Sequence, residues 1–232
     1  GDIILKVDDY SVASTDSVYD IVAKIRGEAG TEVKLSVLHS GDREPVEIKI
    51  KRSQITVPSM TVEFVGSKKD VAHFKVNRFT EETLGLWEKE WNKSVAKINE
   101  AKVEKVILDL RGNPGGFFDA AIYAGDDLLD EGFVISQQVD ADGKIEKFES
   151  TKGGNLLSKK VVVLVDTGSA SASEILAGAL QQAKRAVVIG TKTFGKGTAQ
   201  RIFDLTDGSS LHLTTLKWLL PDGKNINKDN SI

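Results

Sequence analysis

Short apolar runs recur along the second half of the chain, at residues 106–110, 161–165 and 186–189, and each has the length of a strand. Residues 106–110 have the pattern of a buried strand, and residues 161–165 that of a central one. Segments with helical spacing lie between them, one over residues 118–129 and one running through Leu180. Strands that alternate with helices predict βαβ units around a mostly parallel sheet. Ligands of such sheets bind at the carboxyl ends of the strands, so the loops after residues 110 and 165 are expected at the functional edge.

Other elements flank this predicted core. Residues 71–76 have the pattern of a further strand, and residues 202–205 and 211–220 are expected to form a closing hairpin around Asp207 and Gly208. The acidic run at residues 126–131 is interpreted as a solvated helix end. An amphipathic helix is expected over about residues 81–101, because its apolar residues have helical spacing. These are Leu84, Trp87, Trp91, Val95 and Ile98.

Residues 1–53 have the pattern of a separate small α+β module. A strand over residues 3–7 is followed by a helix and by two alternating segments, 33–37 and 46–50, that form a hairpin. Ser14, Thr15 and Asp16 are the expected helix cap. The expected apolar face of the helix comprises Val18, Ile21, Val22 and Ile25. Pro58 marks a connector, so we expect two domains, residues 1–53 and residues 54–232.

The composition excludes several classes of function. Cysteine is absent, which excludes disulfides and thiolate zinc sites, and no other residues have metal-ligand spacing. The net charge is −3 and no basic stripe with aromatic residues occurs, so nucleic acid is not an expected partner. The apolar run at residues 161–165 is far shorter than the ~20 residues of a membrane span. No cofactor is expected.

A serine in a run of small residues is the first candidate for chemistry. Ser171 lies where a strand passes into a helix, and Glu174 follows with the spacing of a capping box. A helix cap is therefore the plainer interpretation of Ser171, and Ser169 and Ser173 compete for any nucleophilic role. The same position would nonetheless aim the backbone N–H of Ala172 at an oxyanion formed on a substrate carbonyl.

A lysine in a later glycine-flanked loop is the second candidate. Lys196 lies between Gly195 and Gly197, and no histidine is near either motif, so a serine–lysine pair is the fitting nucleophile and base. A lysine base must be neutral, and we expect Phe194 and the flanking strands to bury it. Gln200 has the position to orient the lysine. The plainer interpretations are a solvated lysine and an exposed strand residue.

Two further glycine patterns need interpretation. Residues 190–196 fit the phosphate-loop pattern, but Gly197 stands where Ser or Thr must bind magnesium, and a strand follows instead of a helix. A nucleotide site is therefore not expected. Gly115 and Gly116 follow a buried strand, and one of them is expected to give the second oxyanion donor. Asp109 and Arg111 are expected to pair as a structural brace.

Taken together, these motifs resemble the carboxyl-terminal processing proteases, also called tail-specific proteases, over nearly the whole chain. The matching segments are residues 1–52, 107–116, 168–175 with 177–180, and 193–197 with Gln200. The resemblance implies a crotonase-like α/β protease core with a mostly parallel sheet, preceded by a partial PDZ-like domain. It implies a dyad of Ser171 and Lys196 supported by Gln200, with oxyanion donors from Ala172 and from Gly115 or Gly116.

The resemblance also implies partners and location. The PDZ-like domain would bind the substrate's C-terminal tail through its helix and gate the active site. Substrates would be proteins with exposed apolar C-termini, in a periplasmic, cell-surface or thylakoid-lumen setting. A homo-oligomer stays open, and a membrane anchor would have to come from segments outside this sequence.

Two rival functions remain. The chain could be a catalytically silent PDZ-bearing scaffold that only captures protein tails, and the presence of both Ser171 and Lys196 argues against this. A crotonase-type acyl-thioester enzyme would rest on the fold alone. We therefore predict a serine endopeptidase that cleaves near protein C-termini through an acyl-enzyme.

Overall fold

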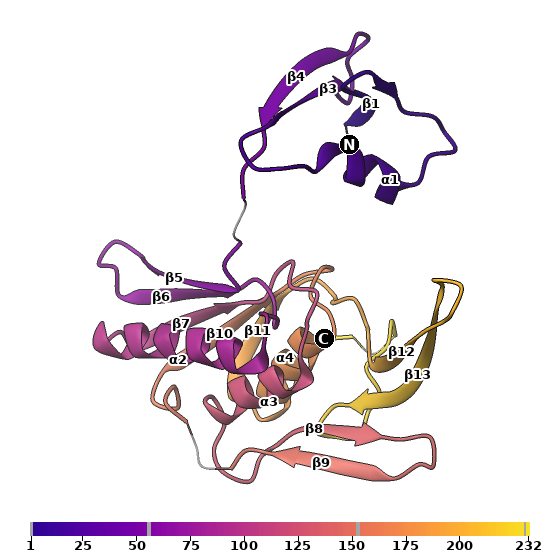
Figure 1. Cartoon of the computed structure of the whole chain (residues 1–232). Helices are drawn as coiled ribbons and strands as arrows, with labels where there is room; N and C mark the ends of the chain where they lie inside the picture. The colour runs from indigo at the N-terminus through magenta and orange to yellow at the C-terminus, as the bar shows by residue number, and fades with distance from the viewer. Residues whose placement is uncertain (1, 55–56, 152–153, 230) are drawn as a thin grey trace. The chain divides into compact units, whose positions relative to one another are not determined.

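The structure is a computed structural model that describes residues 2–54, 57–151, 154–229 and 231–232. The chain divides into two compact units, Gly1–Val57 and Pro58–Ile232 (Figure 1). Each unit has its own hydrophobic core. No helix in the described ranges combines the length and apolar character that a membrane span needs.

The first unit is a small antiparallel sheet with one helix. Its strands are β1 (Ile3–Val7), β2 (Tyr10–Ser11), β3 (Glu32–Leu38) and β4 (Val46–Lys51), in the order β2-β1-β3-β4. The alternating residues Val33, Leu35 and Val37 of β3 point into the core, as their spacing predicted.

Helix α1 (Val18–Ile25) differs from its prediction in two respects. Its cap is Ser17, whose hydroxyl accepts a hydrogen bond from the Asp20 N–H at 3.2 Å, and not the preceding Ser14–Asp16 run. Val18 was expected on the apolar face but is 76% exposed, because the helix contacts its core through Ile21 and Ile25. Val22 is half-buried.

The second unit is built on a five-stranded sheet with the order β11-β10-β7-β6-β5. Strands β6 (Val71–Val76), β7 (Lys105–Asp109), β10 (Lys160–Val165) and β11 (Ala186–Gly190) are parallel, and β5 (Met60–Val65) pairs antiparallel with β6. The mostly parallel sheet predicted from the apolar runs is confirmed. The sequence did not predict β5, whose pattern mixes apolar and polar residues.

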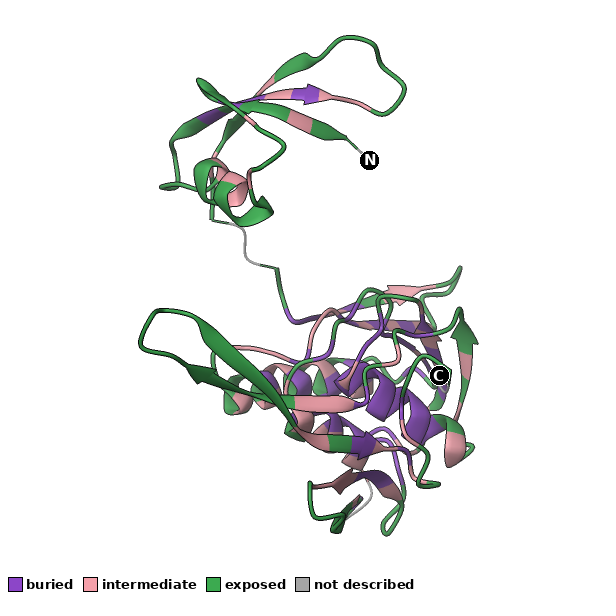
Figure 2. Cartoon of the chain, turned by 90° about the vertical axis from the view of Figure 1, so that its right-hand side faces the viewer, coloured by how far each residue is buried: buried purple, intermediate pink, exposed green. Residues whose placement is uncertain are grey.

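Three helices pack against this sheet: α2 (Leu84–Glu100), α3 (Phe118–Asp126) and α4 (Ala172–Gln182) (Figure 1). Helix α2 buries Trp87, Trp91, Val95 and Ile98, so its predicted apolar face is confirmed. Helix α4 is buried from Ala172 to Leu180 and lies at the centre of the unit, within the purple region of Figure 2.

Helix α3 ends earlier than predicted, at Asp126. Asp127 turns inward, where its carboxylate accepts a hydrogen bond from Trp91 Nε1 at 2.8 Å and from Asn155 Nδ2 at 2.7 Å. The interpretation of this acidic run as wholly solvated was therefore wrong, because Asp127 is buried and joins two helices to the loop before β10.

A second, antiparallel sheet has the order β12-β13-β8-β9. Its strands are β8 (Val134–Val139), β9 (Ile145–Glu149), β12 (Thr198–Asp204) and β13 (Ser210–Leu219). The predicted closing hairpin is present as β12 and β13, and β8 and β9 were not predicted. Trp218 stacks on Phe118 with ring centroids 4.3 Å apart, which fixes the base of this sheet against α3.

Candidate active site

The candidate site lies where three parallel strands end. The loops that follow β7, β10 and β11 contain Gly115, Ser171 and Lys196, and parallel strands place such loops on one sheet edge. Backbone hydrogen bonds join the loops. The Ala170 N–H donates to the Asn113 carbonyl at 3.0 Å, and the Phe194 N–H donates to the Ser169 carbonyl at 2.9 Å.

Ser171 has an unusual backbone conformation. It is the N-cap of α4, with φ 55° and ψ −115°, a region that side-chain-bearing residues seldom adopt. Such strain persists only where the surrounding structure enforces it, and it is frequent at active sites. Ser171 and Glu174 have the reciprocal arrangement of a capping box, and the Ser171 hydroxyl donates no hydrogen bond to the described residues, so its proton is available to a base.

The competing serines are both buried and engaged. The Ser169 hydroxyl donates to the Leu110 carbonyl at 2.8 Å, and the Ser173 hydroxyl donates to the Asn113 carbonyl at 3.0 Å. Ser169 thus ties the β10–α4 loop, and Ser173 the first turn of α4, to the β7–α3 loop. Of the three serines, Ser171 is the one whose geometry suits a nucleophile.

The two glycines of the β7–α3 loop have different roles. A Cβ on Gly115 would lie 2.8 Å from Ser171 Cβ and 3.0 Å from the Ala172 nitrogen, so this glycine packs directly against the serine. The Gly115 N–H donates to Asn113 Oδ1 at 2.9 Å and is therefore occupied. The N–H groups of Gly116 and Ala172 have no hydrogen-bond partner among the described residues.

Lys196 is positioned by its backbone and not by its side chain. It is exposed, and its ammonium group makes no hydrogen bond or ion pair with the described part of the chain. The expectation that Phe194 would bury it was wrong, because Phe194 itself is 56% exposed. Gln200 is also exposed, in β12, and no hydrogen bond joins the side chains of Ser171, Lys196 and Gln200 within the described ranges.

Glu174 connects the serine and lysine loops. Its buried carboxylate accepts hydrogen bonds from the backbone N–H groups of Ser171 at 2.8 Å, Gly195 at 2.7 Å and Lys196 at 2.9 Å. The Thr193 hydroxyl also donates to it, at 2.6 Å. The capping-box spacing indicated the contact with Ser171, but no sequence signal indicated that the same carboxylate would hold the lysine loop.

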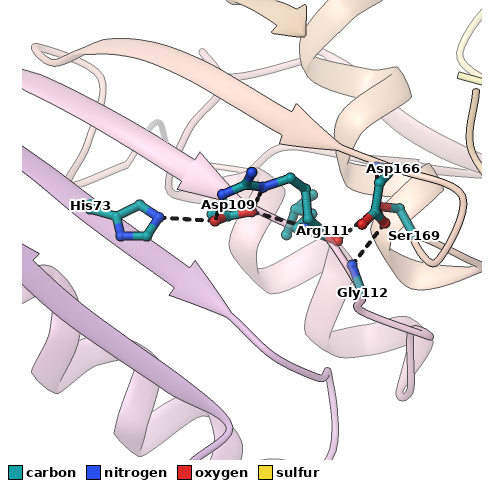
Figure 3. Close-up of polar contacts among 7 residues, drawn as sticks. His73, Asp109, Arg111, Gly112, Asp166 and Ser169 are labelled. Carbon is teal, nitrogen blue, oxygen red and sulfur yellow. Dashed lines mark hydrogen bonds and ion pairs between the residues drawn. The ribbon is translucent and has the colours of Figure 1, made fainter. Parts of the chain in front are cut away.

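A second polar network lies at the end of β7, where the β7–α3 loop begins (Figure 3). Arg111 binds Asp109 through Nε at 2.9 Å and Nη2 at 2.7 Å, which confirms the predicted brace, and His73 Nε2 lies 2.9 Å from the same carboxylate. Burial raises the pKa of Asp109, but the hydrogen bonds from Arg111 and His73 outweigh it and hold the pKa well below its usual range.

Asp166 continues this support on the serine side. Its carboxylate accepts hydrogen bonds from the Gly112 N–H at 2.8 Å and the Gly168 N–H at 2.9 Å, and these hold the pKa of Asp166 below its ordinary value despite partial burial. Asp166 therefore fixes the glycine loop relative to the loop that bears Ser171. The described residues contain no cluster of His, Asp and Glu arranged to hold a metal ion.

Comparison with known proteins places the chain in a family. The model of peptidase family S41 matches residues 70–231. A carboxy-terminal-processing protease of Bartonella bacilliformis is 36% identical over 97% of this chain and 51% of its own length. The carboxy-terminal processing protease CtpA of Bacillus subtilis is 37% identical over 98% of this chain and 47% of its own length.

A solved structure agrees with this assignment. The photosystem II D1 C-terminal processing protease superposes with a TM-score of 0.70 at 28% identity, over all of this chain and 61% of its own. A putative S41 protease from Bacteroides fragilis has the same fold at 20% identity, with a TM-score of 0.67. The chain spans about half the length of the curated relatives it matches. It belongs to peptidase family S41.

Proposed function

We propose that this chain is a serine endopeptidase that cleaves protein substrates near their C-termini through a dyad of Ser171 and Lys196. One observation carries the proposal: a serine in a strained backbone conformation has an available hydroxyl at the start of a buried helix, beside a glycine loop and tied through Glu174 to the lysine loop. The carboxy-terminal processing activity named for the relatives supports the substrate class.

The proposed reaction proceeds through an acyl-enzyme. Ser171 Oγ attacks the scissile carbonyl while the Lys196 amine takes the hydroxyl proton. The C–N bond then breaks, the Lys196 ammonium returns the proton to the leaving amine, and water hydrolyses the ester with the lysine again acting as base. Gln200 would orient the lysine side chain during these transfers. No metal or cofactor takes part in this scheme.

The oxyanion is assigned to two backbone donors. The N–H of Ala172 lies at the positive end of α4, and the N–H of Gly116 is the available donor of the glycine loop because Asn113 occupies that of Gly115. This assigns the second donor to Gly116, where the sequence had left Gly115 and Gly116 as alternatives.

The exposed Lys196 must become neutral to act as a base. Removal of water disfavours an ammonium ion, so a substrate that covers the lysine would favour the neutral amine that the reaction needs. The proposal therefore couples activation of the base to substrate binding. We further propose, from the family resemblance, that the first unit is a partial PDZ-like domain that binds substrate tails and gates the site, and that the protein acts outside the cytoplasm.

Digestion of an unfolded protein with an apolar C-terminus tests the dyad. The parent chain and Lys192→Ala, a matched change of an exposed lysine in the same loop, are expected to cleave it, whereas Ser171→Ala and Lys196→Ala are not. Full activity of Lys196→Ala would refute the dyad.

The silent tail-binding scaffold is the remaining alternative, and the exposed, unpaired ammonium of Lys196 in the described structure is the observation that favours it. A fluorophosphonate probe that acylates serine nucleophiles separates the two. Labelling of the parent at Ser171 supports the peptidase. Tail binding without labelling or cleavage supports the scaffold.

A further inference from the structure

The hairpin of β12 and β13 extends beyond the rest of its sheet. Only the end of β13, from Lys217 to Leu219, pairs with β8, so the described remainder is a two-stranded ribbon. Figure 1 shows this ribbon projecting from the second unit, and residues 200–214 are exposed throughout, as the green colouring in Figure 2 shows. We call residues 200–214 the β12–β13 ribbon.

One face of the β12–β13 ribbon is an apolar strip. The register sets Phe203 opposite Leu211, and Leu213 opposite Arg201, and residues that face each other across a strand pair share a side of the sheet. Leu205 continues the strip, since its N–H pairs with the Ser209 carbonyl at 2.8 Å. A contiguous apolar strip on an exposed ribbon marks a contact surface for another polypeptide.

The other face of the ribbon is mostly polar. It bears Gln200, Ile202 and Asp204, which lie opposite Thr214, His212 and Ser210. Ile202 is 59% exposed and Phe203 is 40% exposed, so the two faces offer apolar residues of similar exposure on the same strand. This provides a matched control for any test of the strip.

Strand β12 also has an open backbone edge. It is the outer strand in the order β12-β13-β8-β9, so one row of its N–H and carbonyl groups has no neighbouring strand in the described sheet. Extended peptides bind such edges by adding a strand. β12 begins at Thr198, two residues after Lys196, in the segment whose Phe194 N–H bonds to the Ser169 carbonyl.

We propose that the edge of β12 is a docking site for an extended polypeptide segment with apolar side chains at alternate positions. The segment adds a strand beside β12, its apolar side chains pack on the strip of Phe203, Leu205, Leu211 and Leu213, and the same polypeptide continues toward Ser171. The inference rests on the proposed function, because it identifies the occupant as substrate. The added strand passes beside Lys196 and removes water from it.

The position of the strip favours a substrate over a second copy of the chain. A permanent partner on β12 would lie next to the loop that bears Lys196 and obstruct entry to the site. A substrate, in contrast, has to bring its scissile bond to Ser171, and a segment added along β12 runs toward the Lys196 loop that Glu174 ties to Ser171. The open edge therefore suits an occupant that arrives and leaves.

Peptide binding to the Ser171→Ala chain tests the proposal without any cleavage. The probe is a fluorescein-labelled peptide of about ten residues, a long strand, in which leucine alternates with threonine. Its C-terminus is amidated, so that it presents no carboxylate to the first unit. Fluorescence anisotropy gives its Kd, and hydrogen exchange reports which backbone amides it protects.

Threonine substitutions keep the strand propensity of the ribbon while removing apolar surface. Phe203→Thr and Leu211→Thr are each expected to weaken binding about tenfold, whereas the control Ile202→Thr stays within about twofold. Bound peptide should slow exchange at β12 amides. Unchanged thermal unfolding midpoints would show that the variants keep their fold.

Three results would overturn the proposal. Equal losses in Phe203→Thr and Ile202→Thr would remove the role of the strip, and protection confined to the first unit would move the site there. A concentration-dependent dimer that Phe203→Thr dissociates, with peptide binding unchanged, would assign the strip to a second copy. Failure of the proposed dyad is seen separately, as cleavage that persists in Ser171→Ala.

Discussion

Replacing Glu174 with glutamine tests how the site is assembled. The Glu174 carboxylate faces only donors: Oε1 accepts from Thr193 Oγ1 and the Gly195 N–H, and Oε2 accepts from the Ser171 and Lys196 N–H groups. Glutamine fits the same space but presents an NH₂ group in place of one oxygen. At Oε2 that group would confront two backbone donors.

The alternative orientation is less unfavourable but still costs free energy. With the NH₂ group at the Oε1 position, the Thr193 hydroxyl can rotate to accept a hydrogen bond, and the Gly195 N–H loses its acceptor. One buried unsatisfied N–H costs about 1–3 kcal/mol, and the remaining bonds lose their charge assistance. Glu174→Gln is therefore expected to lower the free energy of unfolding by about 2–4 kcal/mol.

Activity should fall along with stability, and for a separate reason. The Glu174 carboxylate holds the backbones of both proposed dyad members, so its loss displaces Lys196 relative to Ser171. A misplacement of about 1 Å can cost on the order of 10²-fold in rate. The expected result is a kcat reduced by that order while the variant remains folded.

Tryptophan fluorescence suits the stability measurement. The three tryptophans of the chain, Trp87, Trp91 and Trp218, are all in the second unit, so urea unfolding followed by their emission reports on that unit alone. Glu82→Gln, an exposed position just before α2, is the matched control and should change neither quantity. A Glu174→Gln protein within about 0.5 kcal/mol and twofold in kcat of the parent would refute the reasoning.

Three further substitutions test neighbouring parts of the site. Gly116 has φ +147°, and a Cβ on it would lie 2.3 Å from a backbone carbonyl oxygen, so Gly116→Ala should lower kcat about 100-fold. The control Gly85→Ala, whose Cβ would have no atom within 4 Å, should leave kcat unchanged. Equal rates for the two variants would contradict this. Gly197→Ala places a Cβ 2.0 Å from another carbonyl oxygen and should displace the loop that bears Lys196. We expect kcat to fall at least tenfold and the urea midpoint to fall measurably, and an unchanged kcat would refute this displacement. Burial raises the pKa of Asp109, but hydrogen bonds from its arginine and histidine partners lower it below 3.8, so its stabilisation is complete above that pH and is lost as pH falls further. The parent's urea midpoint should therefore drop more steeply than that of Asp109→Asn from about pH 4 to pH 2, and parallel curves would argue against the assignment.

The core of the second unit was predictable because its apolar spacing is unambiguous. The runs that became β7 and β10 are largely buried in the sheet, whereas the edge strand β11 exposes Val187 and Ile189. Helix α2 shows regular helical spacing through Trp87, Trp91, Val95 and Ile98. Strands β5, β8 and β9 were not predicted because their sequences mix polar and apolar residues. These strands form through hydrogen-bonded pairing with neighbouring strands, which the sequence pattern does not reveal. β8, for example, buries Ser136 and Gln137, whose side chains donate to the carbonyls of Leu219, at the end of β13, and Pro221, just after it.

Parts of the site could not be predicted, for a similar reason. The Glu174 carboxylate accepts hydrogen bonds from two loops that are distant in sequence and meet only after the sheet forms. The expected burial of Lys196 failed because flanking apolar residues do not ensure burial: Phe194 points outward as well. The Asp109–Arg111 pair was predictable, since both residues are close in sequence at the end of one strand.

The site thus separates into a part that is already fixed and a part that is not. Backbone groups are held in place: Ser171 by Glu174, Gly115 by Asn113, and Gly112 by Asp166. The Lys196 side chain has no partner in the described structure and faces water. A polypeptide added along β12 would supply the missing desolvation, because that strand begins beside the lysine. Substrate recognition and activation of the base would then be one event, and an idle enzyme would have no active base with which to cut its surroundings.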